Sequence, residues 1–137
     1  MDRMSDQNPP GRDPLFAGVP YEYGAISPAG ATLFTAGACP LDSEGNIVGP
    51  GDHVEQAGAA LKNLIAAMAR FGAAPEDLVK TTVYVVGDRS DLVAVWNVIE
   101  AGLAPSRPPS TLLGVSVLGY PGQLVEIEGI ASLSQPA

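Results

Sequence analysis

The chain has 137 residues, which suits one compact domain and leaves little room for a second. Its 7 Lys and Arg residues against 15 Asp and Glu residues give a net charge of −8, and no basic cluster is present, so nucleic-acid binding is disfavoured. The single cysteine excludes an intramolecular disulfide framework, and no apolar run reaches the roughly 18 residues of a membrane span.

The N-terminal third is expected to contain a tail, a hairpin and a loop. Residues 1–14 are polar, contain Pro and Gly and lack an apolar signal core, so they predict a flexible tail on a cytoplasmic protein. Residues 15–137 are expected to form the single domain. Within it, residues 15–26 and 31–38 predict two strands joined by the turn sequence SPAG, and residues 40–52 predict a loop with a short ribbon near residues 46–48.

Two helices are expected in the middle of the chain. The first lies between a capping Asp52 and a terminating Gly72. Its apolar stripe is expected to contain Val54, Ala57, Leu61, Leu64, Ile65, Met68 and Phe71. A β-branched strand over residues 78–86 separates it from the second helix. This helix has cap candidates at Asp88, Ser90 and Asp91, and its expected stripe is Leu92, Val95, Trp96, Ile99 and Leu103.

The last third of the chain is expected to complete the sheet with a C-terminal hairpin. The proline-rich residues 104–109 are excluded from helix and central strand, and residues 110–118 and 123–133 predict two strands joined by GYPG. The element order predicts an α+β fold, a mixed sheet with two helices on one face. Because these last strands are apolar at both parities, we expect the second face to pack on another copy of the chain.

Two glutamates, Glu126 and Glu128, interrupt the final apolar run. Residues two apart on a strand share a face, so both should lie opposite Val125 and Ile127. They either keep a solvated face soluble or act in a half-buried cleft, where a carboxylate can position or deprotonate a water. Elsewhere the lone His53 predicts a solvated neighbour of a helix cap, and no ligand spacing predicts a metal site or an organic cofactor.

The closing sequence LVEIEGIA at 124–131 resembles the motif (I/V)E(I/V)EAIA of the Rid family, the reactive intermediate deaminases, also called YjgF and, in an older label, L-PSP endoribonucleases. Further similar pieces occur in the family's order: Pro20-Tyr21, TAGACPLD at 35–42, APEDLVKTTVYVV at 74–86 and RPPSTLLGV at 107–115. The resemblance covers about residues 15 to 134. It implies a chorismate-mutase-like α+β fold, a homotrimer with small-molecule clefts between subunits, and hydrolysis of reactive enamine or imine acids such as 2-aminoacrylate without any cofactor.

The resemblance also implies site residues. Glu126 matches the glutamate thought to position water, Asn97 the cleft asparagine, and Gly37 the glycine of the family's SGQ. Tyr21 matches the cleft tyrosine if the SPAG hairpin carries a two-residue insertion, and otherwise Tyr23 is the equivalent.

Several positions depart from the family pattern. Ser110 stands where an arginine clamps the substrate carboxylate, Leu112 where cysteine is frequent, and Ala36 where serine precedes the glycine. A charge-assisted bidentate pair of that kind contributes a few kcal/mol, on the order of a hundredfold in binding. Arg107, in the neighbouring RPP segment, is an alternative source of positive charge.

Three hypotheses follow. The first is an imine or enamine deaminase that uses Glu126 and water, with a substrate preference altered towards less anionic or larger molecules. The second is a non-catalytic trimer that binds a small metabolite in the same clefts. Ribonuclease activity ranks last, because the net charge of −8 opposes RNA binding.

Overall fold

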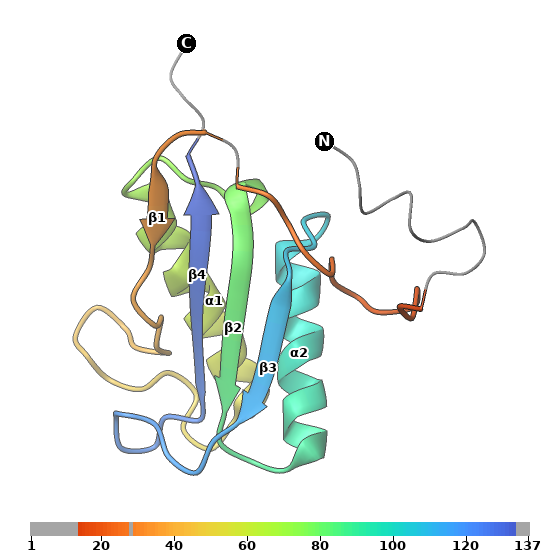
Figure 1. Cartoon of the computed structure of the whole chain (residues 1–137). Coiled ribbons are helices and arrows are strands. Elements are labelled where there is room, and N and C mark those ends of the chain that lie inside the picture. The colour runs from red at the N-terminus through yellow and green to blue at the C-terminus, as the bar shows by residue number, and fades with distance from the viewer. Residues whose placement is uncertain (1–13, 28, 134–137) are drawn as a thin grey trace.

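The computed structural model describes residues 14–27 and 29–133 and consists of one sheet with two α-helices packed on it (Figure 1). The elements in chain order are β1 (Thr32–Phe34), α1 (His53–Ala69), a short 3₁₀ helix (Pro75–Asp77), β2 (Leu78–Val85), α2 (Arg89–Leu103), β3 (Ser110–Gly114) and β4 (Val125–Ser132). The strand order is β1-β4-β2-β3. β4 runs antiparallel to both of its neighbours, whereas β2 and β3 are parallel and joined through α2.

Both helices cover the same face of the sheet, the far face in Figure 1, and leave the other face open. The strands alternate accordingly: along β4, Val125 and Ile127 are buried under the helices, and the alternating Glu126 and Glu128 are half-exposed. This arrangement confirms the predicted α+β architecture. Among the described residues, no helix is long and apolar enough to cross a membrane.

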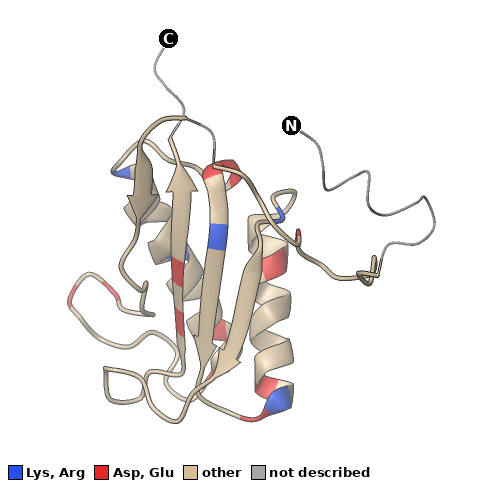
Figure 2. Cartoon of the chain, in the orientation of Figure 1, with Lys and Arg blue, Asp and Glu red and all other residues tan. Residues whose placement is uncertain are grey.

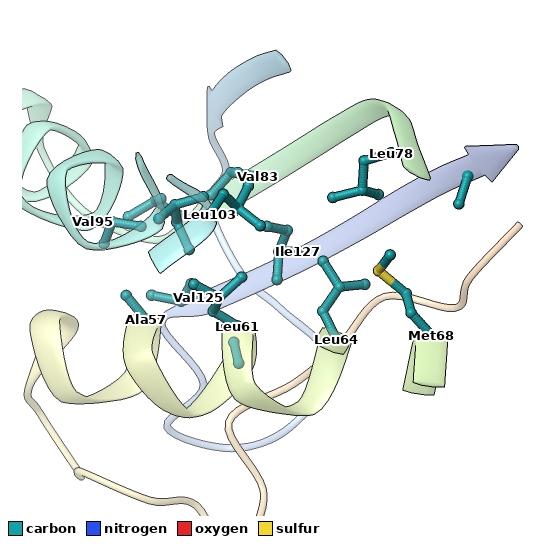
Figure 3. Close-up of a cluster of buried hydrophobic side chains, with 14 of the residues drawn as sticks. Ala57, Leu61, Leu64, Met68, Leu78, Val83, Val95, Leu103, Val125 and Ile127 are labelled. Carbon is teal, nitrogen blue, oxygen red and sulfur yellow. The ribbon is translucent and has the colours of Figure 1, made fainter. Parts of the chain in front are cut away.

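Helix α1 begins where the sequence places its cap. The Asp52 side chain accepts a hydrogen bond from the Glu55 amide at 3.0 Å, which satisfies one of the free N–H groups of the first turn. The buried side of α1 packs on β4, with Leu64 and Met68 against the sheet (Figure 3). The ends of the predicted stripe are wrong, because Val54 is 51% exposed and the helix ends before Phe71, which is 61% exposed.

Helix α2 begins with a reciprocal cap. The Asp88 carboxylate accepts from the Asp91 amide, and the Asp91 carboxylate accepts from the Asp88 amide, so two free donors are satisfied. Val95, Ile99 and Leu103 are buried from this helix. The predicted stripe is confirmed at these three positions.

The strand predicted at residues 15–26 is wrong. Residues 14–27 form turns and bends without a ladder, and prolines and glycines in this segment remove donors and weaken strand pairing. The segment instead contacts the proline-rich residues 104–109: the Glu22 amide donates to the Arg107 carbonyl at 3.1 Å. Of the predicted tail, residues 1–13 lie outside the described residues, as does Pro28 of the SPAG turn.

The predicted C-terminal hairpin is also wrong. β3 ends at Gly114 and β4 begins at Val125, and β2 lies between them in the sheet. The predicted ribbon near residues 46–48 is confirmed by an isolated bridge between Leu41 and Ile47.

Candidate functional site

The two glutamates of β4 alternate with the buried Val125 and Ile127 and therefore lie on the open face of the sheet, as the strand period predicts. Figure 2 marks acidic positions along β4 in red. Their immediate surroundings differ. Glu128 accepts a hydrogen bond from the Tyr84 hydroxyl at 3.0 Å. Burial, followed by this hydrogen bond and the negative charges of both glutamates, raises the pKa of Tyr84, so the phenol stays a proton donor to Glu128. The Glu128 carboxylate is therefore already hydrogen-bonded to a side chain of the neighbouring strand β2.

Glu126 is held by groups from outside the strand. Its Oε1 accepts from Gln123 Nε2 at 3.1 Å and from Cys39 Sγ at 3.5 Å. Its Oε2 lies over Gly37, where a Cβ atom would overlap the carboxylate. Among the residues that the structure describes, none donates a hydrogen bond to Oε2. One carboxylate oxygen is thus fixed, while the other remains available for a water or a ligand.

The thiol of Cys39 responds to this neighbourhood. Burial and then the charge of Glu126 raise the pKa of Cys39, and a hydrogen bond with Gln123 lowers it. The thiol is therefore a neutral donor towards Glu126 at neutral pH. Cys39 is half-buried and contacts the candidate acid.

A separate hollow of about 490 Å³ lies at the other edge of the sheet. It is lined by Pro20, Tyr21, Trp96, Ser110, Thr111 and Leu112. The Tyr21 ring packs edge-on against Trp96 with a centroid distance of 6.5 Å. Tyr23 does not line the hollow; its hydroxyl donates to the Phe16 carbonyl. Of the two tyrosines that the sequence leaves open, Tyr21 is the one beside Ser110.

Ser110 lies on the helix-facing side of β3. It is paired in register with the buried Thr81, whose hydroxyl donates to the Ser110 Oγ at 2.7 Å. Leu112 is paired with the buried Val83 and shares this side. Glu126 is on the opposite face and two strands away. One chain therefore brings Tyr21, Ser110 and Leu112 together, and separately Gly37 and Glu126, but does not bring the two groups together.

The two remaining candidates lie outside both groups. Arg107 is exposed, and its Nη2 donates to the Val19 carbonyl at 2.5 Å, so the guanidinium holds the N-terminal segment instead of reaching Glu126. Asn97 is exposed on α2 and lines neither the hollow nor the surroundings of Glu126.

His53 has a different place from the solvated one that was predicted. Its Nε2 lies 2.7 Å from the Val86 carbonyl and its Nδ1 lies 3.6 Å from an Asp91 oxygen, so it connects the beginnings of the two helices. No group of three or more His, Cys, Asp or Glu residues in the described part of the chain could hold a metal ion.

A model of the endoribonuclease L-PSP family matches residues 13–133. The chain belongs to this family. Among its curated relatives is a RutC family protein of Pyrococcus abyssi, which is 32% identical over 109 residues, covering 80% of this chain and 84% of the relative. The predicted membership of the Rid/YjgF group is thereby confirmed.

Solved structures of the same group have the same fold. The Rid-family protein YyfB of Yersinia pestis, described as of unknown function, is 31% identical, with a TM-score of 0.82 over 92% of this chain and 96% of that one. The Escherichia coli protein TdcF, solved with bound serine, is 28% identical, with a TM-score of 0.68 over 85% of this chain and 96% of that one. Both relatives are thus matched over nearly their full length.

Proposed function

We propose that the chain is an imine or enamine hydrolase in which Glu126 orients and deprotonates the attacking water. The observation that carries this proposal is the geometry of the carboxylate, which has two donors on Oε1 and none from the described residues on Oε2. A general base must be held in a fixed orientation and still present a free lone pair, and this arrangement does both. Membership of the endoribonuclease L-PSP family also supports this proposal.

The chemistry needs little more than this carboxylate. An iminium carbon is already electrophilic, so the site has to hold the substrate and orient a water. The water oxygen bonds to the carbon while one of its protons passes to Glu126, giving a carbinolamine. The same proton then passes from Glu126 to the amino group, and the C–N bond breaks while the hydroxyl proton of the carbinolamine passes to Glu126. Transfer of this second proton to the departing ammonia gives a carbonyl compound and an ammonium ion and restores the carboxylate.

We propose further that the complete cleft forms between copies of the chain in a homotrimer. Glu126 and the hollow around Ser110 lie on opposite faces of the sheet and cannot share a ligand within one chain. A neighbouring copy that packs on the open face would place its hollow beside Glu126. The exposed apolar residues Phe34 and Leu113 support a packed open face.

The substrate is proposed to be less anionic or larger than 2-aminoacrylate. None of the described residues lining the hollow is charged, and Tyr21, Trp96 and Leu112 give it apolar walls. Because Ser110 accepts from Thr81, its own hydroxyl hydrogen is available for an uncharged ligand oxygen. Such a site favours an imine with an apolar side chain.

The test is ammonia release from two imines made in situ: 2-aminoacrylate, and the bulkier imine that an amino-acid oxidase produces from phenylalanine. We expect the parent to accelerate hydrolysis of the bulkier imine more strongly than that of 2-aminoacrylate. Glu126→Gln should abolish both accelerations, and Ser110→Arg should shift the preference towards 2-aminoacrylate. A parent that accelerates neither imine over a protein-free control would overturn the proposal.

The second candidate is a non-catalytic metabolite-binding trimer that uses the same clefts. It is favoured by the position of Ser110, which replaces the family's carboxylate clamp with a single hydroxyl. Binding of phenylpyruvate or phenylalanine in calorimetry, without turnover of either imine, would support it. Ribonuclease activity ranks third because of the net charge of −8.

A further inference from the structure

The turn before β4 places a buried glutamine against the candidate acid. Gln123 is 3% exposed, and its Oε1 accepts from the Tyr120 amide at 3.1 Å. Its Nε2 donates both to the Val125 carbonyl and to Glu126 Oε1, each at 3.1 Å. Because Oε1 faces a backbone N–H and Nε2 faces two acceptors, the hydrogen-bond network fixes the orientation of the amide.

We infer that Gln123 is the positioning residue of Glu126, holding Oε1 so that Oε2 remains directed at the space over Gly37. The Cys39 thiol contacts the same oxygen, so both donors act on one side of the carboxylate. A carboxylate on a strand side chain has several rotamers, and a buried donor from a fixed turn selects one of them. The Gln123 amide group is hydrogen-bonded to the backbone of Tyr120 and Val125 as well as to Glu126. These backbone contacts make it a rigid support for the carboxylate.

The consequence for catalysis rests on the proposed imine hydrolysis, whereas the geometric role does not. If Gln123 only stabilised the turn, its loss would lower the amount of folded protein without moving Glu126. The chain provides a matched control in Gln56. This second buried glutamine donates to the Gly49 and Gly122 carbonyls and accepts from the Leu124 amide, so it holds the same turn but does not touch Glu126.

The experiment compares Gln123→Met, Gln123→Glu and Gln56→Met in the full chain. In ammonia release from the phenylalanine-derived imine, Gln123→Met should lower kcat about ten- to a hundredfold with little change in KM, since a misplaced base costs transition-state stabilisation. Gln123→Glu keeps an acceptor for the Tyr120 amide but places a like charge against Glu126, and should lose activity as well. Gln56→Met should keep the kcat of the parent per folded molecule. A Gln123→Glu variant with the parent's kcat would overturn the inference.

A second measurement decides the geometry even if no imine is hydrolysed. The pH dependence of Cys39 alkylation by iodoacetamide reports on Glu126, because its charge raises the pKa of this thiol while Gln123 lowers it. If the carboxylate leaves its place in Gln123→Met, the raising effect of Glu126 on the pKa of Cys39, which is larger than the lowering effect of Gln123, disappears. Alkylation then begins at lower pH than in the parent. If the carboxylate stays, only the lowering effect of Gln123 is lost and alkylation begins at higher pH, which would overturn the positioning role. Gln56→Met should follow the parent.

Discussion

At the scale of single residues, the two glutamates of β4 show how one sequence pattern serves two purposes. Glu128 accepts a hydrogen bond from the Tyr84 hydroxyl on the open face of the sheet. Glu126 is held at one oxygen by Gln123 and Cys39. The strand period places both on the same face, but it gives no information about which one is engaged. That difference arises from Tyr84, Gln123 and Cys39, which come from three other parts of the chain.

Replacing Glu126 should change the ionisation of Cys39. Burial and then the charge of Glu126 raise the pKa of the thiol, because a nearby negative charge disfavours the thiolate. In Glu126→Gln the charge is absent, so we expect the pKa of Cys39 to fall. Since Cys39 is the only cysteine of the chain, the pH dependence of iodoacetamide labelling measures it directly. An unchanged or higher midpoint would contradict the contact between the thiol and the carboxylate.

Gly37 should tolerate no side chain. A Cβ atom at this position would overlap the Glu126 carboxylate, so Gly37→Ala should displace the acid and abolish the proposed hydrolysis. The matched control is Gly58→Ala in α1, where an added Cβ meets nothing within 4 Å and alanine should stabilise the helix by about 0.5–1 kcal/mol. Urea unfolding and ammonia release measure the two effects. Full activity in Gly37→Ala would show that Glu126 does not need its place over residue 37.

At the scale of elements, the sequence predicts what is local. Both helices begin at the aspartates that can cap them, and the strands around β2 and β4 follow their apolar patterns. The errors concern pairing over a distance. β3 and β4 are neighbours in sequence but are separated by β2, because the crossover through α2 puts β3 beside β2. The segment containing Tyr21 has the β-prone residues of a strand, yet its partner is the proline-rich turn at Arg107.

The candidate site shows the same difference between local features, which the sequence predicts, and contacts between distant segments, which it does not. Glu126 is found from its place in a strand, whereas Gln123 gives no signal beyond its position three residues earlier, after a proline-glycine turn. Its burial and its bond to Glu126 depend on how that turn folds back. Likewise, Cys39 is distant in sequence and meets Glu126 only because the bridge from Ala38 to Ile127 joins the two segments.

The contact between α1 and β4 should dominate stability. Leu64 is fully buried against the sheet (Figure 3), so Leu64→Ala should lower the free energy of unfolding by about 2–5 kcal/mol through lost contacts and a residual cavity. Val54 is apolar and on the same helix but 51% exposed, and Val54→Ala should change it by about 0.5 kcal/mol or less. Denaturant unfolding at one fixed protein concentration gives both values. If both substitutions lowered the free energy of unfolding equally, Val54 would have to be covered by another surface in solution.

At the scale of the whole molecule, the sheet itself separates the two halves of the proposed cleft. Its helix-facing side carries Ser110 and Leu112 at one edge, and its open side carries Glu126 next to the other edge strand. Strand β2 lies between the two groups, and they are on opposite faces of the sheet. A ligand that contacts both halves therefore requires two chains, and the proposed trimer is part of the proposed chemistry.

This requirement predicts complementation between inactive variants. Tyr21→Ala removes a wall of the hollow and Glu126→Gln removes the base, so each homogeneous protein should lack imine hydrolysis. Mixed oligomers, made by co-expressing the two with different tags and purified through both, should regain part of the parent's rate. In these mixtures some clefts combine an intact hollow from one chain with an intact carboxylate from its neighbour. Glu126→Gln mixed with Gly37→Ala should regain nothing, since both changes damage the same half and every cleft keeps a defective carboxylate. Recovery in the first mixture but not in the second would require a cleft shared between copies, whereas failure of both would mean that each chain binds its ligand alone.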